Sequence, residues 1–232
     1  MNQTEQEVFI DYEKVDEKTK AGMDRLFKAP KKNFWLKKRA FDLVVSLLAL
    51  LILSPFLLII YILIFIDDPH GSPIFRQKRV GRHGKLFTMY KFRTMVCNAE
   101  ELKKQLETQN EMDGPVFKIK DDPRITRMGR FLRTTSIDEI LQLVNVVKGD
   151  MSLVGPRPPL PDEVAKYDDY QKLRLVVTPG LTCIWQTASD RNDIPFDEWV
   201  EMDIDYIEHR TMLMDLKVLF KTALVVITRE GR

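Results

Sequence analysis

Residues 43–66 read LVVSLLALLILSPFLLIIYILIFI, a run of 24 residues without a charged side chain. At the rise of an α-helix, such a run is long enough to cross a bilayer core of about 30 Å. No small-residue cleavage site follows it, so it does not resemble a secretory signal. We therefore expect this segment to lie in a membrane.

Ser54 and Pro55 fall in the middle of this run. Proline has no backbone N–H, and its ring clashes with the carbonyl four residues earlier, so we expect the helix to bend here. Basic residues flank the run on both sides, and basic flanks prefer the cytoplasm. These residues are Lys31, Lys32, Lys37, Lys38 and Arg39 before the run and Arg76, Lys78, Arg79, Arg82, Lys85, Lys91 and Arg93 after it.

Two arrangements of this segment follow from the bend and the flanks. A re-entrant helix-break-helix enters and leaves the same leaflet and keeps both basic flanks inside; each half, at about 16 Å, is too short to cross. The alternative is a single-pass anchor with a kinked helix, because proline is tolerated in membrane helices. The charge distribution favours the re-entrant form.

The length of 232 residues allows one folded domain beside the membrane segment. We expect residues 1–36 to form a mobile leader, residues 37–68 the re-entrant membrane helix, and residues 69–232 a cytosolic, membrane-associated catalytic domain. The net charge is only +2, so the whole molecule carries no strong field. Cys97 and Cys183 lie far apart, which argues against a disulfide scaffold and against a zinc site.

The expected fold is mixed α/β, mostly helical, with a small β-hairpin and amphipathic helices at the membrane interface. Two β-like runs, residues 74–80 and 86–92, flank a turn with two glycines. Helices are expected at residues 98–112 and around residues 162–175. A C-terminal helix with apolar residues at helical spacing is expected to pack mainly into the core, with membrane contact as its second possible role.

The sequence TTSIDEILQL, residues 134–143, places the carboxylates of Asp138 and Glu139 side by side. Ser136 followed three residues later by Glu139 matches a capping box, and an apolar helical face follows. These carboxylates could therefore only begin a helix. They could also do chemistry, because the positive end of the helix dipole and the nearby Arg133 would favour ionised Asp138.

The chain has no P-loop, dinucleotide-binding, G-x-S-x-G or H-E-x-x-H motif. It has arginines at a spacing of three, at positions 124, 127, 130 and 133, and a guanidinium can make two hydrogen bonds to a phosphate. An ionised aspartate such as Asp138 can attack phosphorus, and its hard oxygen atoms suit Mg²⁺. These residues permit phosphoryl transfer at a membrane, with Mg²⁺ as cofactor.

Four ordered motifs, from about Lys37 to the C-terminus, resemble the bacterial sugar transferases, also called monotopic polyprenyl-phosphate phosphoglycosyl transferases, in their short form. The motifs are KKRAFDLVVSLLALLILSPFLLII, PIFRQKRVGRHGKLFTMYKFRTM, DDPRITRMGRFLRTTSIDEILQLVNVVKGDMSLVGPRP and VTPGLTCIWQTASDR. The resemblance implies transfer of a sugar-1-phosphate from a UDP-sugar to undecaprenyl phosphate, with release of UMP. It places this step at the cytoplasmic face of the bacterial inner membrane, as the first membrane step of exopolysaccharide, capsule or glycan assembly.

The resemblance also implies residue roles. Asp138 would be the nucleophile that forms a covalent phosphosugar intermediate beside Mg²⁺, and Glu139 would assist it. The residues implied for phosphate and UDP-sugar binding are Arg133, Lys91, Arg93, Arg157 and Arg124. The helix break would lie at Ser54 and Pro55. Membrane lipid is a further implied partner, nucleic acid is not, and a homodimer stays open.

The sequence departs from the family pattern at several positions. Ile140-Leu141 replaces Leu-Pro after the carboxylate pair, and Leu141 is expected to extend the helix. Cys183 and Asp190 replace family glycines, which affects the expected sugar pocket. The segment 98–119 resembles members that use UDP-glucose or UDP-galactose. Two other functions stay open: a silent membrane scaffold, and a glycosyl transferase that releases UDP.

Overall fold

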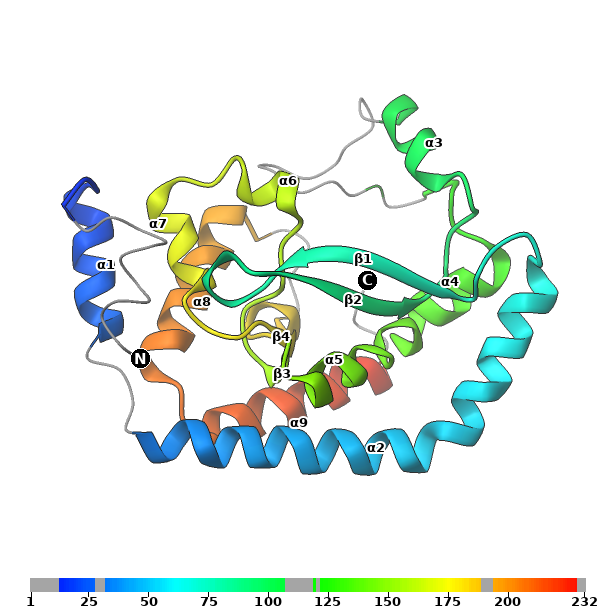
Figure 1. The fold of residues 1–232 in the computed structure, drawn as a ribbon, viewed down its shortest axis with the longest axis horizontal. Helices are drawn as coiled ribbons and strands as arrows, with labels where there is room; N and C mark the ends of the chain where they lie inside the picture. Colours follow the sequence, from blue (N-terminus) through cyan, green and yellow to red (C-terminus); the bar gives the residue numbers. More distant parts are fainter. Residues whose placement is uncertain (1–12, 28–31, 107–118, 120–121, 189–193, 229–232) are drawn as a thin grey trace.

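The computed structural model describes residues 13–27, 32–106, 119, 122–188 and 194–228. Short helices and two small sheets follow a single long helix in the described chain (Figure 1). The helices are α1 Glu17–Phe27, α2 Lys32–Asp67, α3 Ala99–Gln105, α4 Arg127–Thr134, α5 Gln142–Lys148, α6 Pro161–Val164, α7 Asp169–Lys172, α8 Phe196–His209 and α9 Met212–Thr228. The strands are β1 Ile74–Val80, β2 Leu86–Phe92, β3 Ser152–Val154 and β4 Gly180–Thr182, and the 3₁₀ turns include η2 Arg82–Gly84, η4 Ile137–Glu139, η5 Leu173–Leu175 and η6 Trp185–Thr187.

The expected β-hairpin is confirmed. Strands β1 and β2 pair antiparallel, with Ile74 opposite Phe92 and Val80 opposite Leu86. The chain reverses through η2, where His83 and Gly84 both take positive φ angles. A second pair of strands, β3 and β4, is parallel, and it brings Gly155 so close to Gly180 that a side chain at position 180 would collide with the Gly155 backbone.

Helix α2 holds the long apolar run and bends in its middle (Figure 1). Pro55 lies inside it, and the Ser54 hydroxyl donates a 2.8 Å hydrogen bond to the Leu51 carbonyl. Within the described chain α2 is the one helix long and apolar enough to cross a membrane, and only 11% of its most apolar window is buried inside the protein. Its apolar side chains therefore need a cover that the rest of the described chain does not supply.

Both arms of α2 contact the rest of the protein. On the first arm, Arg39 donates hydrogen bonds to the carbonyls of Val146 and Val147 at the end of α5. On the second arm, Ile60 and Ile64 are buried in a small cluster with Phe92 and Leu132. The bend thus wraps the helix along one side of the domain.

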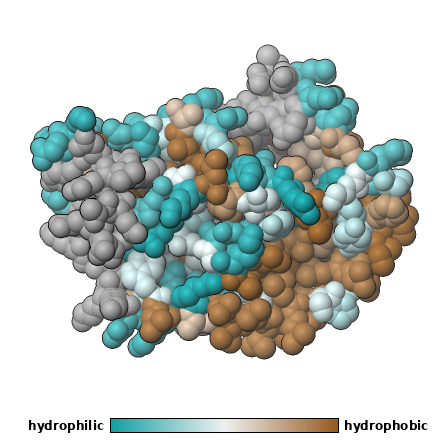
Figure 2. Space-filling view, in the orientation of Figure 1, coloured by the Kyte–Doolittle hydropathy of each residue, from teal (hydrophilic) through white to brown (hydrophobic). Residues whose placement is uncertain are grey.

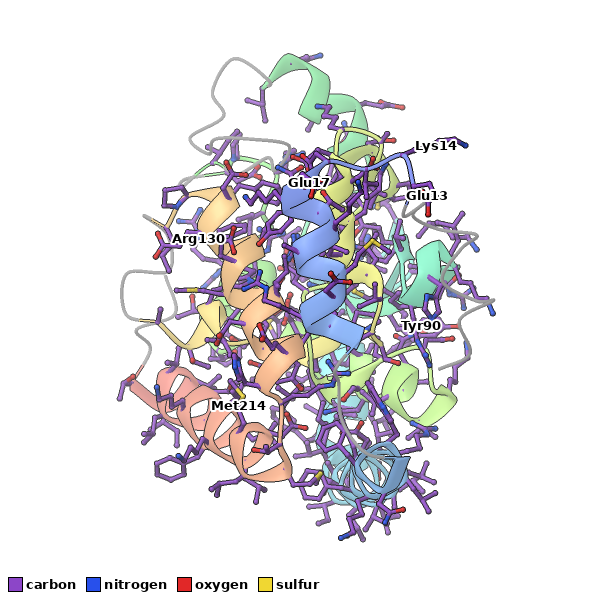
Figure 3. All side chains as sticks on the ribbon, turned by 90° about the vertical axis from the view of Figure 1, so that its left-hand side faces the viewer. Glu13, Lys14, Glu17, Tyr90, Arg130 and Met214 are labelled. Carbon is purple, nitrogen blue, oxygen red and sulfur yellow. The ribbon has the colours of Figure 1, made fainter. Side chains whose placement is uncertain are left out.

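Helix α1 corrects the expectation of a mobile leader for residues 13–27. Val15, Met23 and Leu26 are buried in the main core, and α1 packs beside α7 and α8. Figure 3 shows α1 next to α8, with Glu13, Lys14 and Glu17 at its outer end. Residues 1–12 of the expected leader lie outside the described residues.

The helix expected around residues 162–175 is broken into α6, α7 and η5. Asp168 causes the break, because its side chain accepts a hydrogen bond from the Gln171 backbone N–H and begins a new helix. Helix α3 ends at Gln105, and the remainder of the helix expected over residues 98–112 lies outside the described residues from residue 107 onward.

Helix α9 contradicts the expectation that its apolar residues pack mainly into the core. Its buried residues are Asp215 and Val218, whereas Leu213, Leu216, Phe220 and Leu224 are exposed. Helices α9 and α2 lie along the same edge of the molecule in two views (Figures 1 and 3). Figure 2 shows an apolar surface along this edge. The second expected role of α9, contact with a membrane surface, fits this exposure better.

Candidate active site

Helix α4 is fixed against the end of β2, and this places Arg133. Thr126 caps the helix by accepting a 2.9 Å hydrogen bond from the Gly129 backbone N–H. A Cβ atom at Gly129 would lie only 2.0 Å from the Thr94 carbonyl oxygen, so only glycine allows this approach. Arg133, one turn further, then donates a 2.9 Å hydrogen bond from Nε to the Thr94 hydroxyl.

The expected capping box at Ser136 is wrong. Ser136 has a φ of 55°, in the left-handed region, and its side chain makes no capping hydrogen bond. The chain turns sharply here after α4, and Asp138 and Glu139 lie on the short turn η4. Leu141 does not extend a helix from the carboxylate pair, because α5 begins only at Gln142. A tight turn, rather than a helix start, therefore presents the two carboxylates.

Helix α5 and strand β2 hold this turn in place. Asn145 is fully buried, accepts a hydrogen bond from the Tyr90 backbone N–H and donates one to the Thr88 carbonyl. Lys91, the next residue on β2, donates a 2.6 Å hydrogen bond from Nζ to Glu139 Oε1. The side chain of Glu139 thus faces Lys91 instead of closing a helix cap.

Asp138 lies in different surroundings from Glu139. Its side chain is buried, and within the described chain no other side chain donates a hydrogen bond to its carboxylate. Burial and the negative charge of Glu139 raise the pKa of Asp138 to about 6, against the smaller opposing effects of Lys91 and Arg133. The expected shift toward the ionised form is therefore wrong in direction, because burial outweighs the nearby cations.

The pKa of Glu139 moves the other way. Burial alone would raise this pKa, but the charge and hydrogen bond of Lys91 hold it below the usual range, with help from the charges of Arg157 and Arg79. Glu139 is therefore a fixed anion, and Asp138 is a more basic carboxylate that no other side chain among the described residues holds by a hydrogen bond. This difference suits Asp138 to form a bond and Glu139 to stay charged.

A pocket of about 270 Å³, including space open to solvent, begins at Glu139. Three cations and one carboxylate contribute to its wall, which suits an anionic ligand. The lining residues are Arg79, Met89, Lys91, Glu139, Gln142, Arg157, Pro158, Gly180, Leu181 and Gln186.

The pocket brings together three of the residues implied by the family resemblance: Lys91, Glu139 and Arg157. Arg157 reaches it from the loop after β3, with Nη1 3.6 Å from Glu163 Oε2. Asp138 is the chain neighbour of Glu139, and Arg133 lies near enough to Asp138 to lower its pKa. Asp138 and Arg133 do not line the pocket themselves; the turn that carries Asp138 adjoins it through Glu139.

Arg93 and Arg124 do not line this pocket. Arg93 forms an ion pair with Asp68, at 2.9 Å between Nη1 and Oδ2, just after α2 ends. Arg124 pairs with Asp122 at 2.6 Å. Each guanidinium is thus held by a carboxylate of the chain, and phosphate binding by either one stays a prediction.

Arg79, Gln142 and Gln186 line the pocket, and we did not single them out from the sequence as ligand-binding residues. Arg79 counted there only as one charge of a basic flank. The expected hairpin could have drawn attention to Arg79, because alternation along a strand puts Gln77 and Arg79 on the same face of the hairpin. The two glutamines carry no such signal.

The carboxylates also fit the expected Mg²⁺. The described residues contain no group of three or more histidine, cysteine, aspartate or glutamate side chains that could hold a metal ion by themselves. Mg²⁺ commonly binds through one or two carboxylates together with substrate phosphates, and the carboxylate of Asp138, which is not in an ion pair with any described residue, offers such a ligand. The residues present fit a metal that arrives with its substrate.

Comparison with known proteins connects this site to a family. A sequence model described as "Bacterial sugar transferase" matches residues 33–229. The chain belongs to the bacterial sugar transferase family. The resemblance noted from the sequence motifs is thereby confirmed, and the family agrees with the expectation of a transferase.

Three relatives of this bacterial sugar transferase illustrate the match. An undecaprenyl-phosphate galactose phosphotransferase of Salmonella typhimurium is 48% identical over 201 residues, which cover 84% of the chain and 41% of the relative. Galactosyl transferase CpsE of Streptococcus agalactiae is 45% identical over 196 residues, with 84% and 43% covered. The exopolysaccharide production protein ExoY of Sinorhizobium fredii is 38% identical over 200 residues, with 84% and 88% covered.

The bacterial sugar transferase thus spans about two fifths of the length of the first two relatives and most of the third. The family match begins at residue 33, near the start of α2, and so leaves α1 outside it. The carboxylate turn, the pocket and the long helix all lie inside the matched region.

Proposed function

We propose that the chain transfers a sugar-1-phosphate from a UDP-sugar to undecaprenyl phosphate and releases UMP. One observation carries this proposal: Asp138, with no side-chain hydrogen-bond donor among the described residues and a raised pKa, lies beside Glu139, which Lys91 holds at the edge of a cationic pocket. A basic carboxylate next to a phosphate-binding pocket is the arrangement that nucleophilic attack on phosphorus requires.

The reaction runs in two displacements. In the first, an oxygen of Asp138 forms a bond to the phosphorus that carries the sugar, and the bond from this phosphorus to the oxygen of UMP breaks. UMP leaves with the electron pair. In the second, a phosphate oxygen of undecaprenyl phosphate attacks the same phosphorus, and the Asp138 carboxylate is released.

The other residues of the site act electrostatically, on the charge of the diphosphate and on the pKa of Asp138. Lys91 and Arg157 face the pocket and offset the negative charge of the diphosphate. Glu139, fixed by Lys91, raises the pKa of Asp138 through its own charge and so keeps the nucleophile basic. Mg²⁺, held by Asp138 and phosphate oxygens, would supply further charge compensation.

We also propose that α2 is a re-entrant helix and that the site lies at the cytoplasmic face of the bacterial inner membrane. The support is that both arms contact the same domain: Lys38 on the first arm pairs with Asp215 at 2.5 Å, and Ile64 on the second packs with Leu132. A straight span would carry one of these two contacts into or across the bilayer. The acceptor would then enter from the lipid beside the bend.

The sugar we propose is a hexose, glucose or galactose. The printed names of two relatives contain galactose or galactosyl. The segment 98–119, which resembles family members that use such donors, lies largely outside the described residues. The name of a third relative places it in exopolysaccharide production, which fits our proposal of a first step in glycan assembly.

Product analysis tests the proposal. Full-length protein with Mg²⁺, undecaprenyl phosphate in vesicles and a panel of UDP-sugars should release UMP, and Asp138→Asn should abolish the release. Asp205→Asn is the matched control, because Asp205 is an exposed carboxylate that pairs with His209. Release of UDP would instead identify a glycosyl transferase. Absence of turnover across the panel would identify a scaffold.

A further inference from the structure

Arg79 is a buried cation on the pocket wall whose charge the proposed reaction has not yet used. It lies on β1 and is 7% exposed. Its Nε and Nη2 donate hydrogen bonds of 3.0 and 2.7 Å to Gln77 Oε1, and its Nη1 donates one of 2.9 Å to the Pro158 carbonyl. A guanidinium has five N–H groups, so one remains on each of Nη1 and Nη2.

Among the described residues no carboxylate lies within ion-pair distance of Arg79, although three of the other four buried arginines have such a partner. Arg93 pairs with Asp68, Arg124 with Asp122 and Arg174 with Asp203. The fourth, Arg210, donates a hydrogen bond to the Ile207 carbonyl and lies over the Trp35 ring. For Arg79, burial and the neighbouring charge of Arg157 lower the pKa to about 9, against the smaller opposing effects of the Glu163 and Glu139 charges. A buried charge is costly unless a partner compensates it, so this position is suited to an anion from outside the chain.

The position of Arg79 is rigid. The Val80 backbone N–H donates a 2.9 Å hydrogen bond to the Pro159 carbonyl, and Arg79 bonds to Pro158 in the same loop. This loop carries Arg157, so β1 and the loop hold two guanidinium groups at one wall of the pocket. Preorganised donors of this kind bind a phosphate without paying to order long side chains.

We propose that Arg79, together with Arg157, binds the phosphate of the departing UMP. The inference rests on the proposed function, in which a diphosphate lies between Asp138 and the leaving nucleotide. Lys91 and Arg133, near Asp138, would contact the phosphate that keeps the sugar. When the bond between the two phosphates breaks, the electron pair stays on the UMP oxygen, and Arg79 and Arg157 receive that charge.

Binding of UMP and uridine by the full-length protein tests this assignment. The probe is a fluorescent uridine nucleotide, displaced by UMP or by uridine, in wild type, Arg79→Met, Arg79→Lys and Arg76→Met. Arg76 is the matched control, because it is an exposed arginine on the same strand. We expect Arg79→Met to weaken UMP binding by about 10- to 100-fold, the usual effect of hydrogen bonds to a charged group. Arg79→Lys should lie between Arg79→Met and wild type.

Uridine is the readout that separates phosphate binding from structural support, because it lacks the phosphate. Its affinity should change less than about twofold in Arg79→Met, as should the affinity of Arg76→Met for UMP. Unchanged UMP affinity in Arg79→Met overturns the inference alone. A parallel loss of UMP affinity, uridine affinity and Tm overturns it too and assigns Arg79 to loop support. A wild-type protein that neither binds UMP nor releases it overturns the proposed function itself.

Discussion

Asp138 and Glu139 are neighbours in the chain, yet their carboxylates have opposite electrostatic surroundings. Glu139 is held by Lys91 at 2.6 Å, whereas Asp138 is buried and is not in an ion pair with any described residue. A carboxylate must be ionised to attack phosphorus, and a raised pKa keeps it more basic at the cost of losing charge in mild acid. The two residues are adjacent in the chain and are both acidic, so it is their surroundings that suit them to different roles.

The pKa of Asp138 leads to a pH prediction. The carboxyl group is charged above its pKa of about 6, so about nine tenths of it is ionised at pH 7 and about one tenth at pH 5. The first displacement should therefore slow about tenfold for each pH unit below 6. Single-turnover release of UMP between pH 4.5 and 8 measures this fall in rate at low pH, the acid limb of the pH profile. A rate that stays constant down to pH 5 would contradict the prediction.

Removal of the charge on Glu139 should move this limb. The charge of Glu139 raises the pKa of Asp138, and its loss also frees Lys91 to act on Asp138 alone. In Glu139→Gln both effects lower the pKa, so the acid limb should shift to lower pH, together with a slower rate at pH 7. The same single-turnover profile measures the shift. An acid limb that stays in place or moves to higher pH would contradict this account of Glu139.

The sequence predicted which residues lie near the pocket better than it predicted their pKa shifts and ion pairs. The motifs predicted Lys91 and Arg157, which lie together at the pocket, because a motif records residue type and order; the role of Asp138 stays a prediction. The sign of the pKa shift depends on burial, and burial comes from packing of the turn against α4 and β2, which no local pattern contains. For the same reason Arg93, in the same motif as Lys91, ended in an ion pair with Asp68.

At the element scale, Thr126 precedes helix α4 and Ser136 precedes the turn η4, and the two residues have different roles. Thr126 caps α4, whereas Ser136 makes no cap and takes a positive φ angle. Thr126→Ala should lower the free energy of unfolding by about 1 kcal/mol, and Ser136→Ala should change it by less than about 0.5 kcal/mol. Thermal unfolding in detergent compares them. Equal losses in both variants would restore a cap at Ser136.

The elements that the sequence predicted well are those with strong local patterns. Alternating residues and a glycine turn defined the hairpin, with strands at residues 74–80 and 86–92 as observed. Helical spacing in α9 identified the helix but not what its apolar face contacts, because periodicity cannot distinguish a protein core from lipid. Asp168 begins a new helix, α7, inside another expected helix and so divides it into short pieces.

At the scale of the whole molecule, a buried ion pair joins the long helix to the domain. Lys38 on α2 and Asp215 on α9 are both buried, and Asp215 also accepts a 2.7 Å hydrogen bond from the Tyr206 hydroxyl. The pair fixes the first arm of α2 along α9, with the exposed apolar side chains of both helices at the same edge of the molecule.

Loss of one partner of this pair should be costly. Asp215→Ala leaves the Lys38 charge buried without its partner, which costs about 3–5 kcal/mol and should lower Tm by roughly 10 °C. The double variant Lys38→Met/Asp215→Leu should regain part of this loss, because it removes both charges of the pair and leaves the nearby Asp42 with its hydrogen bonds from Ser152 and Leu153. The exposed Asp205→Ala serves as control. A double variant less stable than Asp215→Ala would contradict this account.

The arrangement of α2 in the membrane is the last expectation at this scale, and the chain offers its own label for testing it. Cys97, after α2, is exposed, and Cys183 is buried. A second label, Lys37→Cys in a Cys97→Ser background, lies before the apolar run at an exposed position.

If α2 is re-entrant, a membrane-impermeant maleimide should modify both positions only from the cytoplasmic side, in inside-out vesicles and not in intact spheroplasts. Ile52→Cys in the same background, 73% exposed near the bend, should stay unreactive from both sides because lipid covers it. Modification of Lys37→Cys and Cys97 from opposite sides would establish a single-pass anchor. Since both arms of α2 pack against one domain, that outcome would also require one of the two packing contacts to open in the membrane.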